Sequence, residues 1–224
     1  MPNNFFDLTE RSDRFEITPG LITTSPDGIR ALGGNDTVTG SQGADTISGN
    51  RGDDVLSGSG GPDVLTGGRN WDTLDGGSEN DVLFGNRGND LLLGNEGADL
   101  IHGGKGSDLL RGGEGNDSLW GDLGADTLEG GEGQDIFILR PDDTAFDTII
   151  DWDFNTDRIG LAFGLTPDQI QVVPLPPPQA SPSTPADNVS ATGVTLQLGT
   201  GQVLAVVPNA RVEQFTTSRF VIAG

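Results

Sequence analysis

The sequence predicts an all-β protein: a right-handed parallel β-roll, meaning a β-solenoid of 18-residue coils, ended by a small C-terminal β cap. Three observations support this prediction. Residues 32–139 divide into twelve consecutive blocks of nine without insertion or deletion, the fifth place of every block is aspartate, and the seventh is always apolar. A period kept over twelve blocks indicates equivalent units stacked on one another.

Each place in the block has a structural role. Three residues around the apolar seventh place can form a short extended strand, with one side chain inward and its neighbours outward. The other six residues must reverse the chain, and the blocks contain 28 of the chain's 36 glycines, which tolerate the positive φ of tight turns. A disordered acidic linker would give no reason for twelve aspartates and twelve apolar residues to stay in phase.

The aspartates predict a metal site. Two blocks make one coil, so each aspartate lies next to the aspartate two blocks later, which gives ten pairs. Two ionised carboxylates about 5 Å apart repel by roughly 3 kcal/mol at an effective dielectric of about 20. A hard divalent cation removes this repulsion, and oxygen ligands in flexible turns favour calcium over magnesium. The predicted ligands are Asp36, Asp45, Asp54, Asp63, Asp72, Asp81, Asp90, Asp99, Asp108, Asp117, Asp126 and Asp135.

Composition excludes several functional classes. Zinc and copper sites need His or Cys, and the chain has one histidine, His102, and no cysteine. A net charge of −22 repels nucleic acid and anionic membranes, and no apolar run is long enough to span a bilayer. There is no His-Glu-x-x-His or Gly-x-Ser-x-Gly motif, and His102 occupies an outward place, so we expect no catalytic residues and no enzyme activity.

The blocks, for example GGKGSDLLR at 103–111, resemble the RTX (hemolysin-type) nonapeptide G-G-x-G-x-D-x-U-x. The resemblance implies up to about ten Ca²⁺ ions held between turns one coil apart, by the aspartates and by backbone carbonyls of earlier turn residues. The carbonyl ligands that it implies are those of Gly94, Asn95, Glu96, Gly97, Gly103, Gly104, Lys105, Gly106, Gly112, Gly113, Glu114, Gly115, Gly121, Asp122, Leu123 and Gly124.

Two blocks depart from the repeat. Asn70 and Glu79 stand at the third place, where the other ten blocks have glycine. Asn tolerates positive φ, whereas Glu does so poorly. We therefore expect the sites that use Asp72 and Asp81 to be weaker, distorted or empty.

The flanking segments predict caps. Residues 1–31 form an N-terminal cap with a degenerate repeat that keeps Asp27 and Ile29 in phase, and 32–139 form the roll. Residues 140–224 form a C-terminal β cap that is similar to the serralysin-like region after the roll, with Asp147, Asp151 and Asp157 at matching places. This cap contains a proline-rich loop at 174–186 and a β-hairpin across 195–207.

Outward places in the even-numbered blocks carry an apolar set: Val64, Val82, Phe84, Leu100, Trp120 and Ile136. An exposed patch of this kind normally has a partner. We expect the C-terminal segment to fold back over it. The alternative is a face for self-association or for a ligand such as a polysaccharide.

These features together predict a secreted calcium-binding protein that folds on binding many Ca²⁺ ions between stacked GGxGxD turns. The first residues carry acids and no apolar core, so we expect no cleavable secretory signal there. The resemblance implies an extracellular or cell-surface location, reached by a type I system that reads an uncleaved C-terminal signal. Two alternatives stay open: a surface-layer, matrix or adhesin component that binds polysaccharide or assembles with itself, and a non-catalytic accessory of a secreted RTX enzyme.

Overall fold

A computed structural model describes residues 5–18, 28–141, 145–175 and 193–223. Its elements are almost all strands, with three short 3₁₀ helices in the C-terminal part. The elements are β1 (Phe6–Asp7), β2 (Arg14–Glu16), β3 (Ile29–Arg30), β4 (Thr37–Thr39), β5 (Thr46–Arg51), β6 (Val55–Ser57), β7 (Val64–Arg69), β8 (Thr73–Ser78), β9 (Val82–Arg87), β10 (Leu91–Glu96), β11 (Leu100–Lys105), β12 (Leu109–Glu114), β13 (Ser118–Leu123), β14 (Thr127–Glu132), β15 (Ile136–Leu139), β16 (Asp147–Ile149), β17 (Arg158–Leu161), η2 (Pro167–Gln169), β18 (Ile170–Pro174), β19 (Gly193–Leu198), β20 (Val203–Pro208), η3 (Val212–Gln214), η4 (Thr217–Arg219) and β21 (Phe220–Ile222).

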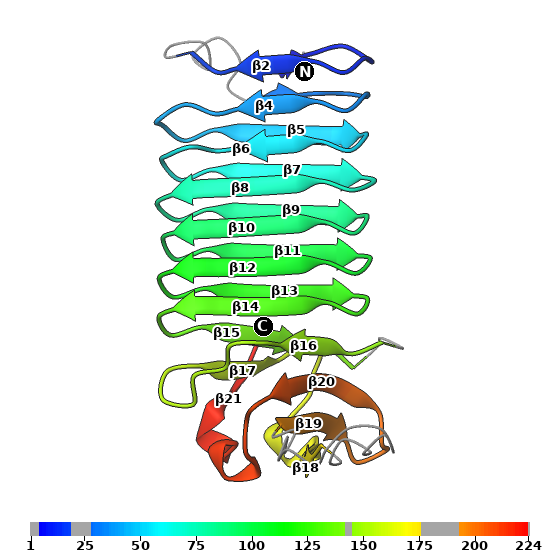
Figure 1. The fold of residues 1–224 in the computed structure, drawn as a ribbon, viewed down its shortest axis with the longest axis vertical. Coiled ribbons are helices and arrows are strands. Elements are labelled where there is room, and N and C mark those ends of the chain that lie inside the picture. The colour runs from blue at the N-terminus through cyan, green and yellow to red at the C-terminus, as the bar shows by residue number, and fades with distance from the viewer. Residues whose placement is uncertain (1–4, 19–27, 142–144, 176–192, 224) are drawn as a thin grey trace, which may run out of the picture.

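The strands form two long sheets that face each other along a solenoid (Figure 1). The ten-stranded sheet has the order β1-β3-β5-β7-β9-β11-β13-β15-β17-β21, and the eleven-stranded sheet has the order β18-β19-β20-β16-β14-β12-β10-β8-β6-β4-β2. Neighbouring strands within the repeats pair in parallel with an offset of two blocks, for example Ile101 with Leu119. This arrangement confirms the predicted solenoid, in which two blocks form each coil.

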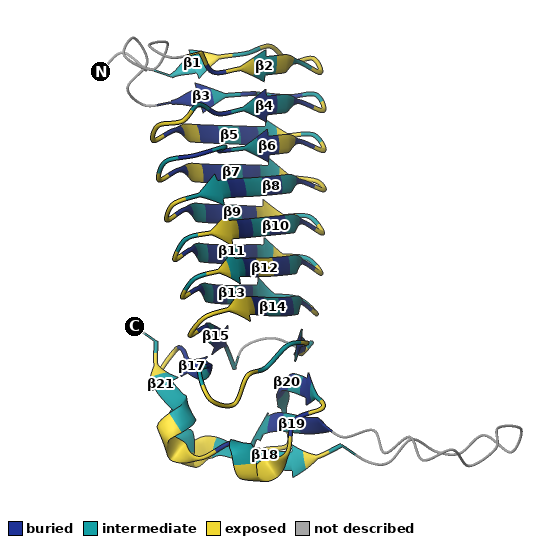
Figure 2. Cartoon of the chain, turned by 60° about the vertical axis from the view of Figure 1, so that its left-hand side comes forward, coloured by how far each residue is buried: buried dark blue, intermediate teal, exposed yellow. Residues whose placement is uncertain are grey.

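The core lies between the two sheets, and both sheets contribute buried apolar residues to it. The buried positions recur along the strands, in dark blue in Figure 2. All twelve seventh-place residues, from Val38 to Phe137, have no solvent exposure. Inward and outward side chains alternate along the strands from β4 to β14, as in the pattern of β11, where Ile101 is buried between half-buried Leu100 and His102. The predicted inward place is therefore correct in every block.

The strands are longer than the three residues that the pattern predicts. Most strands of the roll span six residues, because pairing resumes after a glycine and continues into the turn motif. In β11, Leu100, Ile101 and His102 pair with β13, Gly103 is skipped, and Gly104 and Lys105 pair again. The extra pairing satisfies turn amides and carbonyls that would otherwise need water.

Both ends of the roll carry additional strands. At the N-terminal end, Phe15 pairs with Val38 and Ile29 pairs with Ile47, so short strands extend both sheets there. At the other end, β19 and β20 form the predicted hairpin, antiparallel across Gly193–Pro208. Asp27 and most of the predicted proline-rich loop (174–186) lie outside the described residues.

The expectation that the C-terminal segment covers the outer apolar face is wrong for the described residues. β17 and β21 extend the ten-stranded sheet at its end, and β16 and β20 extend the other sheet (Figure 1). The physical reason is that an open solenoid end exposes both unpaired strand edges and core, so covering that end satisfies more groups than covering one face. No helix among the described residues is long and apolar enough to cross a membrane.

Candidate calcium sites

The twelve predicted aspartates form two buried columns, one along each turn edge of the roll. Each aspartate has at most 3% of its surface exposed. One column contains Asp36, Asp54, Asp72, Asp90, Asp108 and Asp126, and the other contains Asp45, Asp63, Asp81, Asp99, Asp117 and Asp135.

Within a column, aspartates of consecutive coils are in direct contact. The backbone N–H of each donates to Oδ1 of the next, for example Asp90 to Asp108 and Asp108 to Asp126, both at 2.8 Å. All ten pairs show this contact, with N···O distances of 2.7–2.9 Å. Asp108 and Asp117, which belong to consecutive blocks of the sequence, lie in different columns.

The second carboxylate oxygen of most of these aspartates lacks a hydrogen-bond partner among the described residues. This holds for Oδ2 of Asp36, Asp54, Asp63, Asp72, Asp81, Asp90, Asp99, Asp108, Asp117 and Asp135, and for Oδ1 of Asp45. An unsatisfied buried polar atom costs about 1–3 kcal/mol, and more when it is charged. Eleven such atoms in two columns therefore require a ligand or a proton.

Glycine leaves the space that these oxygens face. A Cβ added to Gly103 would lie 2.5 Å from Oδ2 of Asp108 and 2.9 Å from the carbonyl oxygen of Gly121, one coil further on. The last glycine of the other blocks is likewise next to the aspartate oxygen of its own turn. A carboxylate oxygen and a carbonyl oxygen from adjacent coils thus face one small space that any side chain would fill.

Burial shifts eight of the roll aspartates strongly toward the neutral form. Burial is the largest cause of the raised pKa of Asp63, Asp72 and Asp108. The hydrogen bond from the backbone N–H of the preceding coil lowers the pKa of each, and the neighbouring carboxylates raise it further. The pKa rises to about 8 for Asp72, to about 7 for Asp63, Asp108 and Asp117, and to about 6 for Asp54, Asp81, Asp90 and Asp135.

The donor set fits calcium. It contains only carboxylate and carbonyl oxygens, which are the ligands that a hard cation prefers. No group of three His, Cys, Asp or Glu side chains gathers within the described ranges, so backbone carbonyls must complete any site. The carbonyls of Lys105, Glu114 and Leu123 already accept an N–H from the preceding coil, which leaves each one lone pair. The histidine lies on the outer face, where its Nδ1 is 2.9 Å from Oδ2 of Asp122.

The two irregular blocks keep the columns but change the turn backbone. Asn70 and Glu79 have φ of 81° and 76°, whereas the third-place glycines from Gly88 to Gly133 have φ of 137–149°. Asp72 and Asp81 still donate to Asp90 and Asp99 at 2.8 and 2.7 Å. The change is therefore confined to the turn, and weaker binding at these blocks stays a prediction.

Both columns continue beyond the repeats, which the nine-residue phase does not reveal. Asp13 donates its N–H to Oδ1 of Asp36 at 2.7 Å. At the other end, Asp126 donates to Asp147 at 3.2 Å, and Asp135 donates to Asp157 at 3.3 Å. The two aspartates of these pairs are 23, 21 and 22 residues apart in the sequence, which is more than the 18 residues of two blocks. The only sequence signal for these three positions is an aspartate followed by apolar strand residues.

Two sheets wound into parallel coils, with a column of buried aspartates along each edge, define a parallel β-roll. Residues 30–137 match the family model of the RTX calcium-binding nonapeptide repeat (4 copies), in overlapping placements at 30–65, 48–83, 66–101, 75–110 and 102–137. The chain therefore carries an array of RTX calcium-binding nonapeptide repeats across residues 30–137.

Solved structures with a similar shape include a subunit of the mannuronan C5-epimerase from Azotobacter vinelandii and the extracellular lipase LipA from Serratia marcescens. The epimerase subunit is 18% identical with a TM-score of 0.33, and the match covers 96% of this chain and 80% of that one. The lipase is 15% identical with a TM-score of 0.27, and the match covers 85% of this chain and 40% of the lipase. No curated protein matches the sequence.

Proposed function

We propose that this protein is a secreted β-roll whose folding is switched by calcium. The observation that supports this most strongly is the set of eleven buried carboxylate oxygens without a hydrogen-bond partner in the described structure. When bound, calcium supplies the positive charge and the coordination that these oxygens lack. The twelve roll aspartates would hold the ions, together with turn carbonyls such as those of Gly103 and Gly121.

The columns couple the coils to one another. Each inner aspartate contacts the coil before it through Oδ1 and the coil after it through its N–H, as Asp108 does with Asp90 and Asp126. Losing one cation therefore leaves unsatisfied carboxylates in two adjacent coils. Because a preformed site does not exist in the unfolded chain, binding free energy becomes folding free energy. Folding should be cooperative along the roll.

The charge of the chain agrees with many bound ions. About ten Ca²⁺ would add +20 to the formal charge of −22 and leave about −2. A chain that stays unfolded at cytosolic calcium and folds outside the cell suits export by a type I system. An extracellular or cell-surface location is therefore part of this proposal. Extracellular calcium modules bind with Kd of about 10⁻⁴–10⁻³ M, which matches this role.

A second candidate function is a rigid spacer in an extracellular matrix or surface layer. It is favoured by the outer face of the ten-stranded sheet, where the C-terminal segment leaves Val64 36% exposed and Phe84 and Trp120 half-buried. In this case calcium would still fold the roll, and the face would bind a polymer or another copy.

A calcium titration tests the leading proposal. Circular dichroism of the full chain should show little β-sheet in chelator and a cooperative gain between about 10⁻⁴ and 10⁻³ M calcium. Equilibrium dialysis with ⁴⁵Ca should count several ions per chain, and magnesium at the same concentrations should not replace calcium. A complete β-sheet signal in chelator, unchanged by calcium, would contradict the proposal.

A further inference from the structure

Four cations form a column on the ten-stranded sheet. Arg51, Arg69, Arg87 and Lys105 occupy the same place in consecutive coils, and Arg51–Arg69, Arg69–Arg87 and Arg87–Lys105 are in register. All four side chains are exposed. They are a third of the chain's 12 Lys and Arg residues, in a protein with net charge −22. We call these four residues the cation column.

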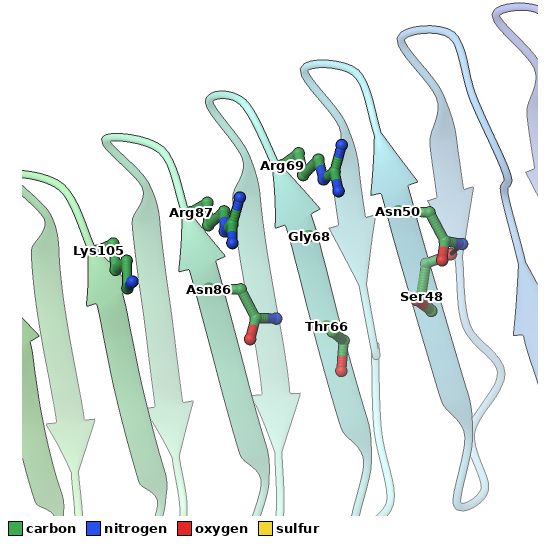
Figure 3. Close-up of a pocket in the computed structure, with 8 residues that line it drawn as sticks. All are labelled: Ser48, Asn50, Thr66, Gly68, Arg69, Asn86, Arg87 and Lys105. Carbon is green, nitrogen blue, oxygen red and sulfur yellow. Dashed lines mark hydrogen bonds between the residues drawn. The ribbon is translucent and has the colours of Figure 1, made fainter.

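The cation column borders a groove. Arg69, Arg87 and Lys105 line a shallow groove of about 410 Å³ together with Ser48, Asn50, Thr66, Gly68 and Asn86 (Figure 3). The hydroxyl and amide groups come from the same strands as three of the cations, β5, β7 and β9. The groove therefore offers positive charge and neutral hydrogen-bonding groups along the direction of the roll.

No ion pair among the described residues neutralises this column. The corresponding place on the eleven-stranded sheet is acidic, with Glu96, Glu114 and Glu132 in register. Like charges stacked at the parallel-strand spacing of about 4.8 Å repel one another, so an anionic ligand would relieve the column.

An aromatic ladder continues the groove. Phe84, His102 and Trp120 follow Ser48 and Thr66 in the same register. The ring centroids of Phe84 and His102 are 5.3 Å apart and those of His102 and Trp120 are 5.1 Å apart, with nearly parallel planes. Such a ladder presents a row of aromatic ring edges beside the groove, which the C–H groups of a sugar ring can contact.

We propose that the cation column and its groove bind an acidic polysaccharide that carries a carboxylate on each ring, such as a polyuronate. A pyranose ring has a length comparable to the coil spacing of about 4.8 Å, so carboxylates along the polymer can meet cations of the column while ring hydroxyls contact the Ser, Thr and Asn side chains. Duplex DNA fits less well, because it carries one charge per about 1.7 Å of its axis. The rest of this acidic chain repels nucleic acid of either kind. The groove exists only on a folded roll, so this proposal rests on the calcium-dependent folding proposed above.

Calorimetric titration with an oligogalacturonate long enough to span four coils tests the proposal. Protein and ligand are dialysed to the same free calcium, because uronates bind calcium themselves, and circular dichroism of each sample confirms the folded roll. The double variant R69Q/R87Q should bind roughly tenfold more weakly, since it loses two exposed charge contacts. The charge-matched control R14Q/R111Q alters two exposed arginines on the eleven-stranded sheet and should change affinity less than about twofold.

Four results would overturn the proposal. These are no binding by the folded wild-type chain, equal weakening in both double variants, tighter binding of single-stranded DNA than of the uronate, and self-association by light scattering that R69Q/R87Q abolishes. The last result would identify a second copy as the occupant of the groove. A β-sheet signal that persists in chelator would contradict calcium-dependent folding instead, and the titration would still report on the groove.

Discussion

The aspartates of the roll differ from the acids at its ends in how their oxygens are satisfied. In the roll, one oxygen accepts a backbone N–H and, for eleven of the twelve, the other lacks a partner in the described structure. At the C-terminal end, Asp151 accepts the N–H groups of Gly130 and Gly131 at 3.0 and 2.7 Å. Asp157 accepts the N–H groups of Asp135 and Asp153 on its two oxygens.

The difference shows which parts of the molecule need a cation. Asp151 and Asp157 have protein donors on both oxygens. At the N-terminal end, Oδ2 of Asp13 accepts the N–H and the hydroxyl of Thr9. The C-terminal end also has apolar core residues of its own, with Val194, Leu196 and Leu204 buried. We infer a roll that depends on calcium between two ends that depend on it much less.

Of the changes considered, acidification without calcium should have the largest effect on the stability of the roll relative to its ends. Burial raises the pKa of eight roll aspartates from 3.8 to about 6–8, so the folded apo roll binds more protons than the unfolded chain. Such groups contribute stability that is fully present below pH 3.8 and is lost as pH rises through 6–8. In chelator, the β-sheet signal should therefore be stronger near pH 4 than at pH 8. A signal that grows with pH in chelator would contradict this.

Calcium should reverse that dependence, because cation binding requires the ionised carboxylates. The same pH series at saturating calcium is the control. It should show greater stability at pH 8 than at pH 5.

Gly106→Ala should give the next largest effect. Gly106 has φ of 146°, and an added Cβ would overlap the carbonyl oxygen of Gly88. We expect a loss of about 4 kcal/mol or more in the free energy of unfolding at saturating calcium, measured with denaturant. Gly43→Ala is the matched control at the same place of another block, because the nearest atom to its added Cβ is Oγ of Ser41 at 3.8 Å. It should cost less than about 1 kcal/mol, and equal losses would contradict the account.

Asp108→Asn and Asp151→Asn compare a roll acid with an end acid. Asp108 belongs to two of the ten contacts, with Asp90 and Asp126, so its asparagine variant should bind up to two fewer ions and need more calcium to fold. Asp151→Asn loses one backbone hydrogen bond and should cost about 1–3 kcal/mol at saturating calcium with an unchanged ion count. Equilibrium dialysis and denaturant unfolding measure the two quantities. A reduced ion count in Asp151→Asn would place that residue among the ligands.

Glu79→Gly should have the smallest effect, and it should be stabilising. Glu79 holds φ of 76°, which costs a glutamate roughly 1 kcal/mol and a glycine almost nothing. The denaturant midpoint at saturating calcium should rise by a corresponding amount. Asn70→Gly is the comparison at the preceding block, and it should gain less because asparagine tolerates this conformation. Destabilisation by Glu79→Gly would show that the glutamate side chain supports the turn.

The roll could be predicted because one short pattern sets the local structure in every block. The seventh-place residues, the pairing of Asp90 with Asp108, and the coil length follow directly from the nine-residue period. The six-residue length of the strands could not be predicted, because the pairing of Gly104 and Lys105 depends on contacts with the next coil. The end acids break the phase, so only the three-dimensional stack identifies Asp147 and Asp157 as continuations of the columns.

The C-terminal segment was predicted least well. Its hairpin followed from local turn signals, but its position depended on competition between the open end of the roll and the outer face. Sequence composition alone does not tell whether the segment is more stable on the open end or on the outer face. The cation column was readable, since Arg51, Arg69, Arg87 and Lys105 recur at every second block, but only after the coil length is known.

Hydrogen exchange of the full chain, followed by mass spectrometry at neutral pH, tests the dependence of the roll on calcium most directly. Strands β5–β14 should be protected at saturating calcium and exchange fully in chelator, while β19 and β20 retain much more of their protection. Roll strands that stay protected in chelator would contradict the account, because the unpartnered carboxylate oxygens would then not require a cation.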